Sequence, residues 1–235
     1  MIKRAIILAG GKGTRLKPYT ISLPKPLVPI VDKPIIEIII QQLVKNGFNH
    51  ITLTINHMAE IIKAFCGDGS KWGVKIDYSH EEMPLSTMGP LTLIKDLPDN
   101  FLVMNGDVLT DLNFAEFYDY HVKSKNIFTI ASFKREHVNN YGVLEVGVCG
   151  SLSGFFEKPV HKFEVSMGVY MVNKEILNFI PENTSYGFDN LMEDLLFAKR
   201  TVNVRTHSSY WLDIGRPDDY EQAFLDYDEI LKYQV

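Results

Sequence analysis

The chain has 235 residues, a formal net charge of −5 and hydrophobic residues at 46% of its positions. These values are ordinary for a globular domain, and the acidic balance argues against a nucleic-acid-binding protein, which usually has a basic excess. Cys66 and Cys149 show no metal-ligand spacing, so we expect two reduced thiols. The apolar run at 5–9 is too short for a secretion signal or a membrane span, and we expect a cytoplasmic protein with no membrane contact.

The first half of the chain predicts alternating strands and helices. Apolar or alternating runs place strands at 5–8, 51–55, 74–78 and 101–104, and helices at 35–44, 57–66 and about 91–95. The isoleucines of 35–44 would also suit a strand, but a strand of this length is uncommon. Strands that alternate with helices form right-handed units, so we expect an α/β fold with a Rossmann-like, mostly parallel central sheet flanked by helices.

The second half of the chain has a different texture, with several strands and little helix up to residue 172. Strands are expected at 127–133, 143–146, 152–156, 165–172, 202–205 and 211–214, and helices at 174–179, 189–199 and 217–232. No low-complexity stretch or obvious linker divides the chain. We therefore expect one domain over 1–235, with a small added sheet region in its second half.

A glycine-rich loop follows the first predicted strand, from Gly10 to Arg15. Glycine lets backbone N–H groups approach a ligand closely, and a nest of such groups suits phosphate. The spacing matches neither the Walker A motif nor the dinucleotide fingerprint, so a simple tight turn is an alternative at this point. Pro24 and Pro26 restrict the backbone on both sides of Lys25, which favours a functional lysine over a mobile surface side chain.

The same segment closely resembles the signature of sugar-1-phosphate nucleotidyltransferases. The matching residues are Gly10-Gly11-Lys12-Gly13-Thr14-Arg15-Leu16, Pro18, Thr20, Pro24-Lys25-Pro26-Leu27 and Pro29. The resemblance continues in spaced motifs over nearly the whole chain. It implies the nucleotide-diphospho-sugar transferase type of fold, and a reaction in which an NTP and a sugar 1-phosphate give an NDP-sugar and pyrophosphate. The chain ends in a predicted helix without the hexapeptide repeats of several relatives, so we expect a stand-alone catalytic domain.

The resemblance also implies roles for individual residues. Arg15 would contact the leaving pyrophosphate and Lys25 would lie near the α-phosphate, as the two catalytic residues. The implied nucleotide-binding residues are Leu8, Ala9, Gly10, Gly11, Gly13, Thr14, Glu82, Leu85, Gly89, Asn105 and Asp107. The sugar phosphate is already an ionised nucleophile, so this chemistry calls for cations and a metal ion rather than a catalytic base. We expect the seven histidines to be structural or to lie on the surface.

Two aspartates match the metal-binding motifs of the family. Asp107 follows a predicted buried strand in Asn105-Gly106-Asp107, and ligands of such sheets gather at the carboxyl ends of strands. Asp213 lies in Trp211-Leu212-Asp213-Ile214-Gly215, which resembles the second motif. Carboxylates together with phosphate oxygens suit Mg²⁺, so the resemblance implies a magnesium site formed by both aspartates. A turn aspartate and a strand-end aspartate are the structural alternatives.

The remaining motifs concern the base and the sugar. Residues 84–91 resemble the base-binding loop, although Ser86 and Met88 stand where the family more often has glycine and alanine. The resemblance implies a nucleotide-binding half at about 1–125 and a sugar-binding half at about 126–235. The implied sugar-phosphate-binding residues are Gly142, Glu157, Lys158 and Gly168. A solvated charge pair is the alternative for the neighbouring Glu157 and Lys158.

Several substrates and two other functions stay open on sequence alone. The 84–91 loop and the Glu157-Lys158-Pro159 motif look most like mannose- and heptose-type guanylyltransferases, so GTP is favoured; thymidylyl-, uridylyl- and cytidylyltransferases share the same signature. A non-catalytic NDP-sugar-binding regulatory homologue is disfavoured because Lys25 and the other catalytic and metal residues are present. A cytidylyltransferase for a phosphorylated alcohol or amino compound would lack the sugar motif. Homo-oligomers are common in the family, and no sequence feature fixes their number.

Overall fold

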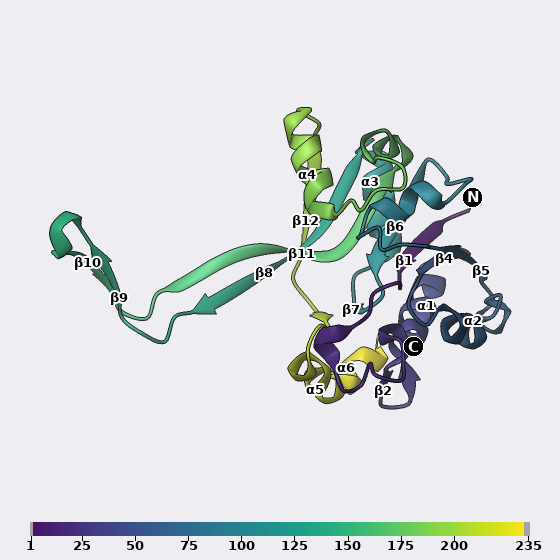
Figure 1. The fold of residues 1–235 in the computed structure, drawn as a ribbon, viewed down its shortest axis with the longest axis horizontal. Coiled ribbons are helices and arrows are strands. Elements are labelled where there is room, and N and C mark those ends of the chain that lie inside the picture. Colours follow the sequence, from purple (N-terminus) through teal and green to yellow (C-terminus); the bar gives the residue numbers. More distant parts are fainter. Residues whose placement is uncertain (1, 233–235) are drawn as a thin grey trace.

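The computed structural model describes residues 2–232 and has a seven-stranded sheet at its centre (Figure 1). Its strands, in order across the sheet, are β12 (Val202–His207), β8 (Phe128–Val138), β11 (Val160–Asn173), β6 (Asn100–Asn105), β1 (Arg4–Leu8), β4 (His50–Ile55) and β5 (Lys75–His80). β11 is antiparallel to both of its neighbours, and the other neighbouring pairs are parallel. The prediction of a mostly parallel α/β sheet is confirmed.

Helices cover both faces of this sheet. They are α1 (Ile35–Lys45), α2 (Ala59–Cys66), α3 (Phe114–Lys123), α4 (Phe188–Phe197), α5 (Pro217–Leu225) and α6 (Tyr227–Lys232). Successive strand residues point to opposite faces, and in β1 Ile7 packs with residues of α1, α2, α3 and α5. Ile6 packs into a second core cluster with α4. A central strand that is apolar on both sides is therefore buried between two helical layers.

Three small sheets add to the central one. They are formed by β2 (Pro29–Ile30) with β3 (Lys33–Pro34), β7 (Val108–Thr110) with β13 (Trp211–Asp213), and β9 (Val143–Val146) with β10 (Leu152–Phe156). The predicted added sheet region is thus present. It does not lie over the core, however, because β8 and β11 continue beyond the central sheet and carry β9 and β10 outward on a long arm (Figure 1).

The structure differs from the predicted elements in several places. α3 was not predicted; it begins after Asn113, whose Oδ1 accepts a hydrogen bond from Glu116 N at 3.0 Å. The helices expected near 91–95 and at 174–179 are 3₁₀ helices. The expected helix at 217–232 is divided at Asp226 into α5 and α6. Among the described residues, no helix is long and apolar enough to cross a membrane.

Candidate active site

A cavity of about 320 Å³ opens at the carboxyl ends of β1, β4, β5 and β6. Parallel strands bring their carboxyl ends to one edge of the sheet, which is where open α/β sheets bind ligands. The cavity is lined by Leu8, Gly10, Gly11, Thr54, Asn56, Glu81, Pro84, Ser86, Thr87, Asn105 and Asp107. It therefore combines the glycine loop, the end of β6 and the loop that precedes the 3₁₀ helix Gly89–Leu93.

The glycine loop passes close to the neighbouring strands. Ala9 N donates to Thr54 O at 2.9 Å, so the chain leaves β1 against the end of β4. A Cβ on Gly10 would lie 2.9 Å from Glu81 Oε1, so a larger residue there would have to displace this carboxylate. Gly13 has a φ of +60°, and its carbonyl accepts a hydrogen bond from Thr20 Oγ1 at 2.7 Å. Of the loop glycines, Gly10 and Gly11 line the cavity.

The cations of this segment differ in their surroundings. Lys12, Arg15 and Lys17 are exposed, whereas Lys25 is half-buried. Pro24 and Pro26 flank Lys25 at the start of a 3₁₀ helix, and the Lys25 Nζ donates a hydrogen bond to Asp107 Oδ2. The turn between the prolines therefore holds this ammonium group against Asp107, which lines the cavity.

Asp107 and Asp213 are brought together by the pairing of β7 with β13. Asp213 lies opposite Val108 in this ladder, and Ile214 N donates to Asp107 O at 3.0 Å. Burial, followed by the negative charge of Asp107, raises the pKa of Asp213, while the charges of Lys25 and then Arg15 act in the opposite direction. Two carboxylates and two cations of the predicted site therefore share one electrostatic environment.

The chemistry of these two carboxylates fits a divalent cation. Asp107 Oδ1 is buried and has no hydrogen-bond partner, which is costly for a carboxylate oxygen unless a ligand or water satisfies it. Within residues 2–232 no group of three or more histidine, cysteine or acidic side chains gathers around a point. A cation here would need further oxygen ligands from substrate phosphates or water, which is how Mg²⁺ is commonly held.

The carboxylate that faces the cavity near the 84–91 loop is Glu81. Glu81 is buried, and its Oε2 accepts a hydrogen bond from Leu85 N at 3.1 Å. Burial raises the pKa of Glu81. Glu82, which the sequence analysis selected, is exposed and does not line the cavity. The sequence alone does not distinguish the two adjacent carboxylates, and the structure places Glu81 at the cavity.

Other residues of this loop are placed by packing. Leu85 and Gly89 are buried, and a Cβ on Gly89 would lie 2.7 Å from Thr184 O. Ser86 lines the cavity with a φ of +66°, a conformation that glycine adopts without strain. This backbone explains why a glycine would suit the position. Asn56, which the sequence analysis missed, lines the cavity and donates from Nδ2 to Glu81 O at 2.7 Å.

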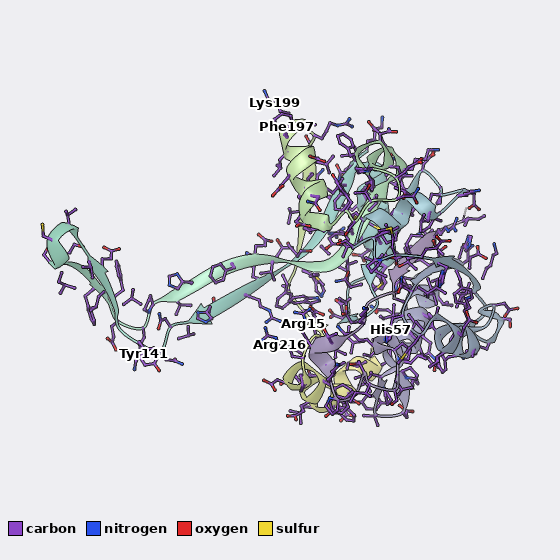
Figure 2. All side chains as sticks on the ribbon, viewed as in Figure 1. Arg15, His57, Tyr141, Phe197, Lys199 and Arg216 are labelled. Carbon is purple, nitrogen blue, oxygen red and sulfur yellow. The ribbon has the colours of Figure 1, made fainter. Side chains whose placement is uncertain are left out.

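The predicted sugar-phosphate residues are divided between the body and the arm. Gly168 is in the body beside the cavity: its φ is +72°, and a Cβ there would lie 2.6 Å from Asn105 Nδ2. Gly142 lies on the arm, and a Cβ added to it would be 3.2 Å from Glu157 Oε2. Glu157 and the adjacent Lys158 therefore also lie on the arm. Figure 2 shows the neighbouring Tyr141 far out on the arm and Arg15 on the body. The structure therefore does not bring these arm residues to the cavity of their own chain.

The chain resembles known proteins over most of its length. A model of a family described as nucleotidyl transferase matches residues 4–230. The chain is similar to mannose-1-phosphate guanylyltransferase catalytic subunit beta of Xenopus tropicalis, with 35% identity over 230 residues that cover 92% of this chain and 62% of the relative. It is also similar to UTP–glucose-1-phosphate uridylyltransferase of Synechocystis, with 32% identity over 240 residues that cover 94% and 62%.

Among solved structures, HddC from Yersinia pseudotuberculosis complexed with GMP-PN is similar to this chain. The identity is 26%, the TM-score is 0.72, and the match covers 96% of this chain and 100% of the other. The chain spans about three fifths of the length of the curated relatives it matches.

Proposed function

Because this chain belongs to the nucleotidyl transferase family, we propose that it transfers a nucleoside monophosphate from an NTP to a sugar 1-phosphate and releases pyrophosphate. The observation that carries this proposal is the pair of Asp107 and Asp213 beside Lys25 and Arg15, next to the glycine loop. Phosphoryl transfer needs aligned substrates and stabilisation of charge more than it needs a base. Cations and paired carboxylates around a cavity supply that kind of site.

Each group has a role that follows from its position. The backbone at Gly10 and Gly11 would lie along the triphosphate, because these glycines line the cavity without side chains. Lys25 would move its hydrogen bond from Asp107 to the α-phosphate. Arg15 is exposed at the edge of the site and would contact the departing pyrophosphate.

Asp107 and Asp213 would hold a divalent metal ion, for which Mg²⁺ is the proposed identity. Members of the family generally use a divalent metal, and Mg²⁺ prefers one or two carboxylates together with phosphate oxygens and water. When bound, the ion would neutralise charge on the phosphate oxygens. Asp107 Oδ1, which has no hydrogen-bond partner, is the oxygen available for it.

GTP is the proposed nucleotide because Glu81 supplies a carboxylate to the cavity. A carboxylate accepts hydrogen bonds and cannot donate them when ionised. The pairing edge of guanine offers two adjacent donors, its N1–H and its 2-amino group, whereas uracil and thymine offer one donor flanked by carbonyl oxygens. A site built around acceptors should therefore favour guanine. A relative named as a guanylyltransferase and a GMP-PN complex point the same way, and the uridylyltransferase relative is the alternative.

A mannose- or heptose-type sugar 1-phosphate is the proposed second substrate. Gly168 leaves room beside Asn105 at the cavity. Glu157 would accept hydrogen bonds from sugar hydroxyls, Lys158 would pair with the sugar phosphate, and Gly142 would allow close approach of the sugar. The guanylyltransferase relative named for mannose 1-phosphate supports this choice of sugar.

The test is pyrophosphate release from GTP, CTP, UTP, dTTP and ATP, each paired with mannose, glucose and heptose 1-phosphates, with and without Mg²⁺. The proposal predicts metal-dependent release that is fastest with GTP and one of the mannose-type sugars. Release without any sugar phosphate would contradict the reaction class. Tight binding of an NDP-sugar with no release from any pair would show a binding protein instead of an enzyme.

A further inference from the structure

The arm formed by residues 134–165 is uncovered along its whole length. No residue of 134–165 is buried, although the arm is rich in large apolar side chains. Those that are at least 47% exposed are Val138, Tyr141, Leu144, Val146, Val148, Leu152, Phe155, Phe156, Val160 and Phe163. Summed over both faces of the ribbon they expose on the order of 1,000 Å², a concentration of apolar surface that ordinarily marks an interaction site. A two-stranded ribbon of this kind is marginally stable by itself, so the arm requires a covering partner.

The base of the arm is fixed to the body. Ser132 Oγ donates to Glu164 Oε1 at 2.7 Å, and Thr206 of β12 donates to the same carboxylate. The rings of Phe133 and Trp211 lie 5.5 Å apart, and Arg135 stacks on Trp211 at 4.8 Å. From this base the ladder of β8 and β11 continues without a register shift as far as Val138 and Val160. The ribbon therefore leads away from its own cavity, as Figure 1 shows.

The arm carries some of the proposed substrate residues. Gly142, Glu157 and Lys158 lie on the arm, while Asp107 lines the cavity and Lys25 contacts Asp107. The cavity of about 320 Å³ is at the lower end of the range for small-molecule sites, about 300–1,000 Å³. No residue of the arm lines it. If the arm residues contact the sugar phosphate, as the proposed function has it, another molecule must therefore supply them.

A second copy of this chain accounts for both features. The fifteen residues 134–148 span at most about 50 Å at ~3.3 Å per residue, and a body of this size is about 45 Å across. The arm is thus long enough to cross the body of a neighbouring molecule. In a two-fold pair each arm would cover the other body, and the apolar surface of one arm is of the same order as the roughly 800 Å² per partner that a standard interface buries.

We propose that the 134–165 arm docks on a second copy of this chain and completes the sugar-phosphate side of its cavity with Glu157 and Lys158. The inference rests on the proposed function for the role of these two side chains. The claim that a second copy covers the arm rests separately on the exposed apolar surface of the arm. The two parts are therefore tested by different measurements.

Association is measured by sedimentation velocity of the full chain. The wild-type protein should be a dimer, and the double variant Phe155→Ser/Phe163→Ser should raise the dimer Kd at least about tenfold, because it removes two exposed arm rings. Phe197→Ser is the matched control: Phe197 is 91% exposed on α4, away from the arm (Figure 2), and should leave the Kd unchanged. A monomeric wild-type protein, or equal effects of the arm and control variants, would overturn the proposal.

The shared site is tested by mixing two inactive proteins. Lys25→Ala removes the cavity lysine, and Glu157→Ala/Lys158→Ala removes the arm pair. Random exchange of subunits in an equal mixture should restore about a quarter of the wild-type rate of pyrophosphate release, because half of the dimers then have one intact site of two. No recovery from an exchanging mixture, or full activity of the Glu157→Ala/Lys158→Ala protein alone, would overturn the shared site. A wild-type protein that forms a dimer but has no activity would instead contradict the proposed function. It would also contradict the role of Glu157 and Lys158, which depends on that function.

Discussion

Lys25 Nζ donates a hydrogen bond to Asp107 Oδ2 across 82 residues of sequence. The contact joins the proline-flanked turn after the glycine loop to the end of β6. It leaves Asp107 Oδ1 buried without a partner. One carboxylate thus contacts Lys25 through one oxygen, and in the proposed function its other oxygen would bind the divalent cation.

Lys25→Ala should lower the kcat for pyrophosphate release by about 10²–10³-fold, the usual cost of losing one donor that stabilises charge in the transition state. The fold should be retained, because Lys25 is half-buried at the edge of the cavity. Lys17→Ala, an exposed cation of the same segment, is the control and should leave kcat within about twofold. A near-normal kcat for Lys25→Ala would remove this lysine from the mechanism.

Asp213→Asn should stabilise the metal-free protein at neutral pH while it weakens metal-dependent activity. Burial and the charge of Asp107 raise the pKa of Asp213 in the folded state, so its ionised form opposes folding. Below the pKa that Asp213 has in the unfolded chain, the side chain is protonated in both states and does not oppose folding. This stability is lost as the pH rises through the raised pKa of the folded state, where Asp213 ionises. The gain from the variant should therefore be largest at neutral pH and shrink as the pH falls.

Urea unfolding of both proteins between pH 4 and pH 7 measures this difference, with Asp218→Asn, an exposed aspartate, as the control. Added Mg²⁺ should stabilise the wild-type protein more than Asp213→Asn. A variant that is less stable than the wild type at pH 7 without metal would contradict the electrostatic account of Asp213.

Glu81→Gln should reduce the preference for GTP. The amide keeps one acceptor and gains a donor, so it should pair less well with two adjacent donors of guanine and better with a carbonyl oxygen of uracil or thymine. The ratio of kcat/KM for GTP to that for UTP should fall by about 10-fold or more. Glu82→Gln, at the adjacent exposed position, is the matched control, and an equal effect of both substitutions would refute the assignment of Glu81.

Gly168→Ala should destabilise the protein and raise the KM for substrate. Its φ is +72°, and the new Cβ would lie 2.6 Å from Asn105 Nδ2, which lines the cavity. Gly73→Ala has a similar φ of +69° but no atom within 4 Å of its Cβ, so it should cost only about 1 kcal/mol of backbone strain. Thermal unfolding and the KM of the two variants separate backbone strain from the contact with Asn105. Equal losses of stability in Gly168→Ala and Gly73→Ala would argue against that contact.

The sequence predicted those parts of the site that adjacent residues determine. Apolar runs followed by glycine identified β1 and the loop from Gly10, and flanking prolines identified Lys25 as a restrained side chain. The spacing of apolar residues identified α1 correctly against a strand. These features depend on backbone conformation and periodicity within a few residues, which local sequence encodes.

Other placements became visible only in the structure. The sequence analysis named Glu82, whereas Glu81 lines the cavity because its N–H continues the β5 ladder by donating to Ile55 O. α3 was missed although its signal is local: Phe114, Phe117, Tyr118 and His121 have helical spacing and follow the N-cap Asn113.

The sequence by itself therefore determined the family resemblance, the central sheet and the identities of the charged groups. The tertiary structure decided which of these groups meet: the β7–β13 pairing places Asp213 beside Asp107, and the anchored ladder of β8 and β11 carries Glu157 and Lys158 away from their own cavity. The physical reason is that spacing along a chain fixes local geometry, whereas the distance between remote segments depends on how the elements pack and in which direction a strand pair leaves the core.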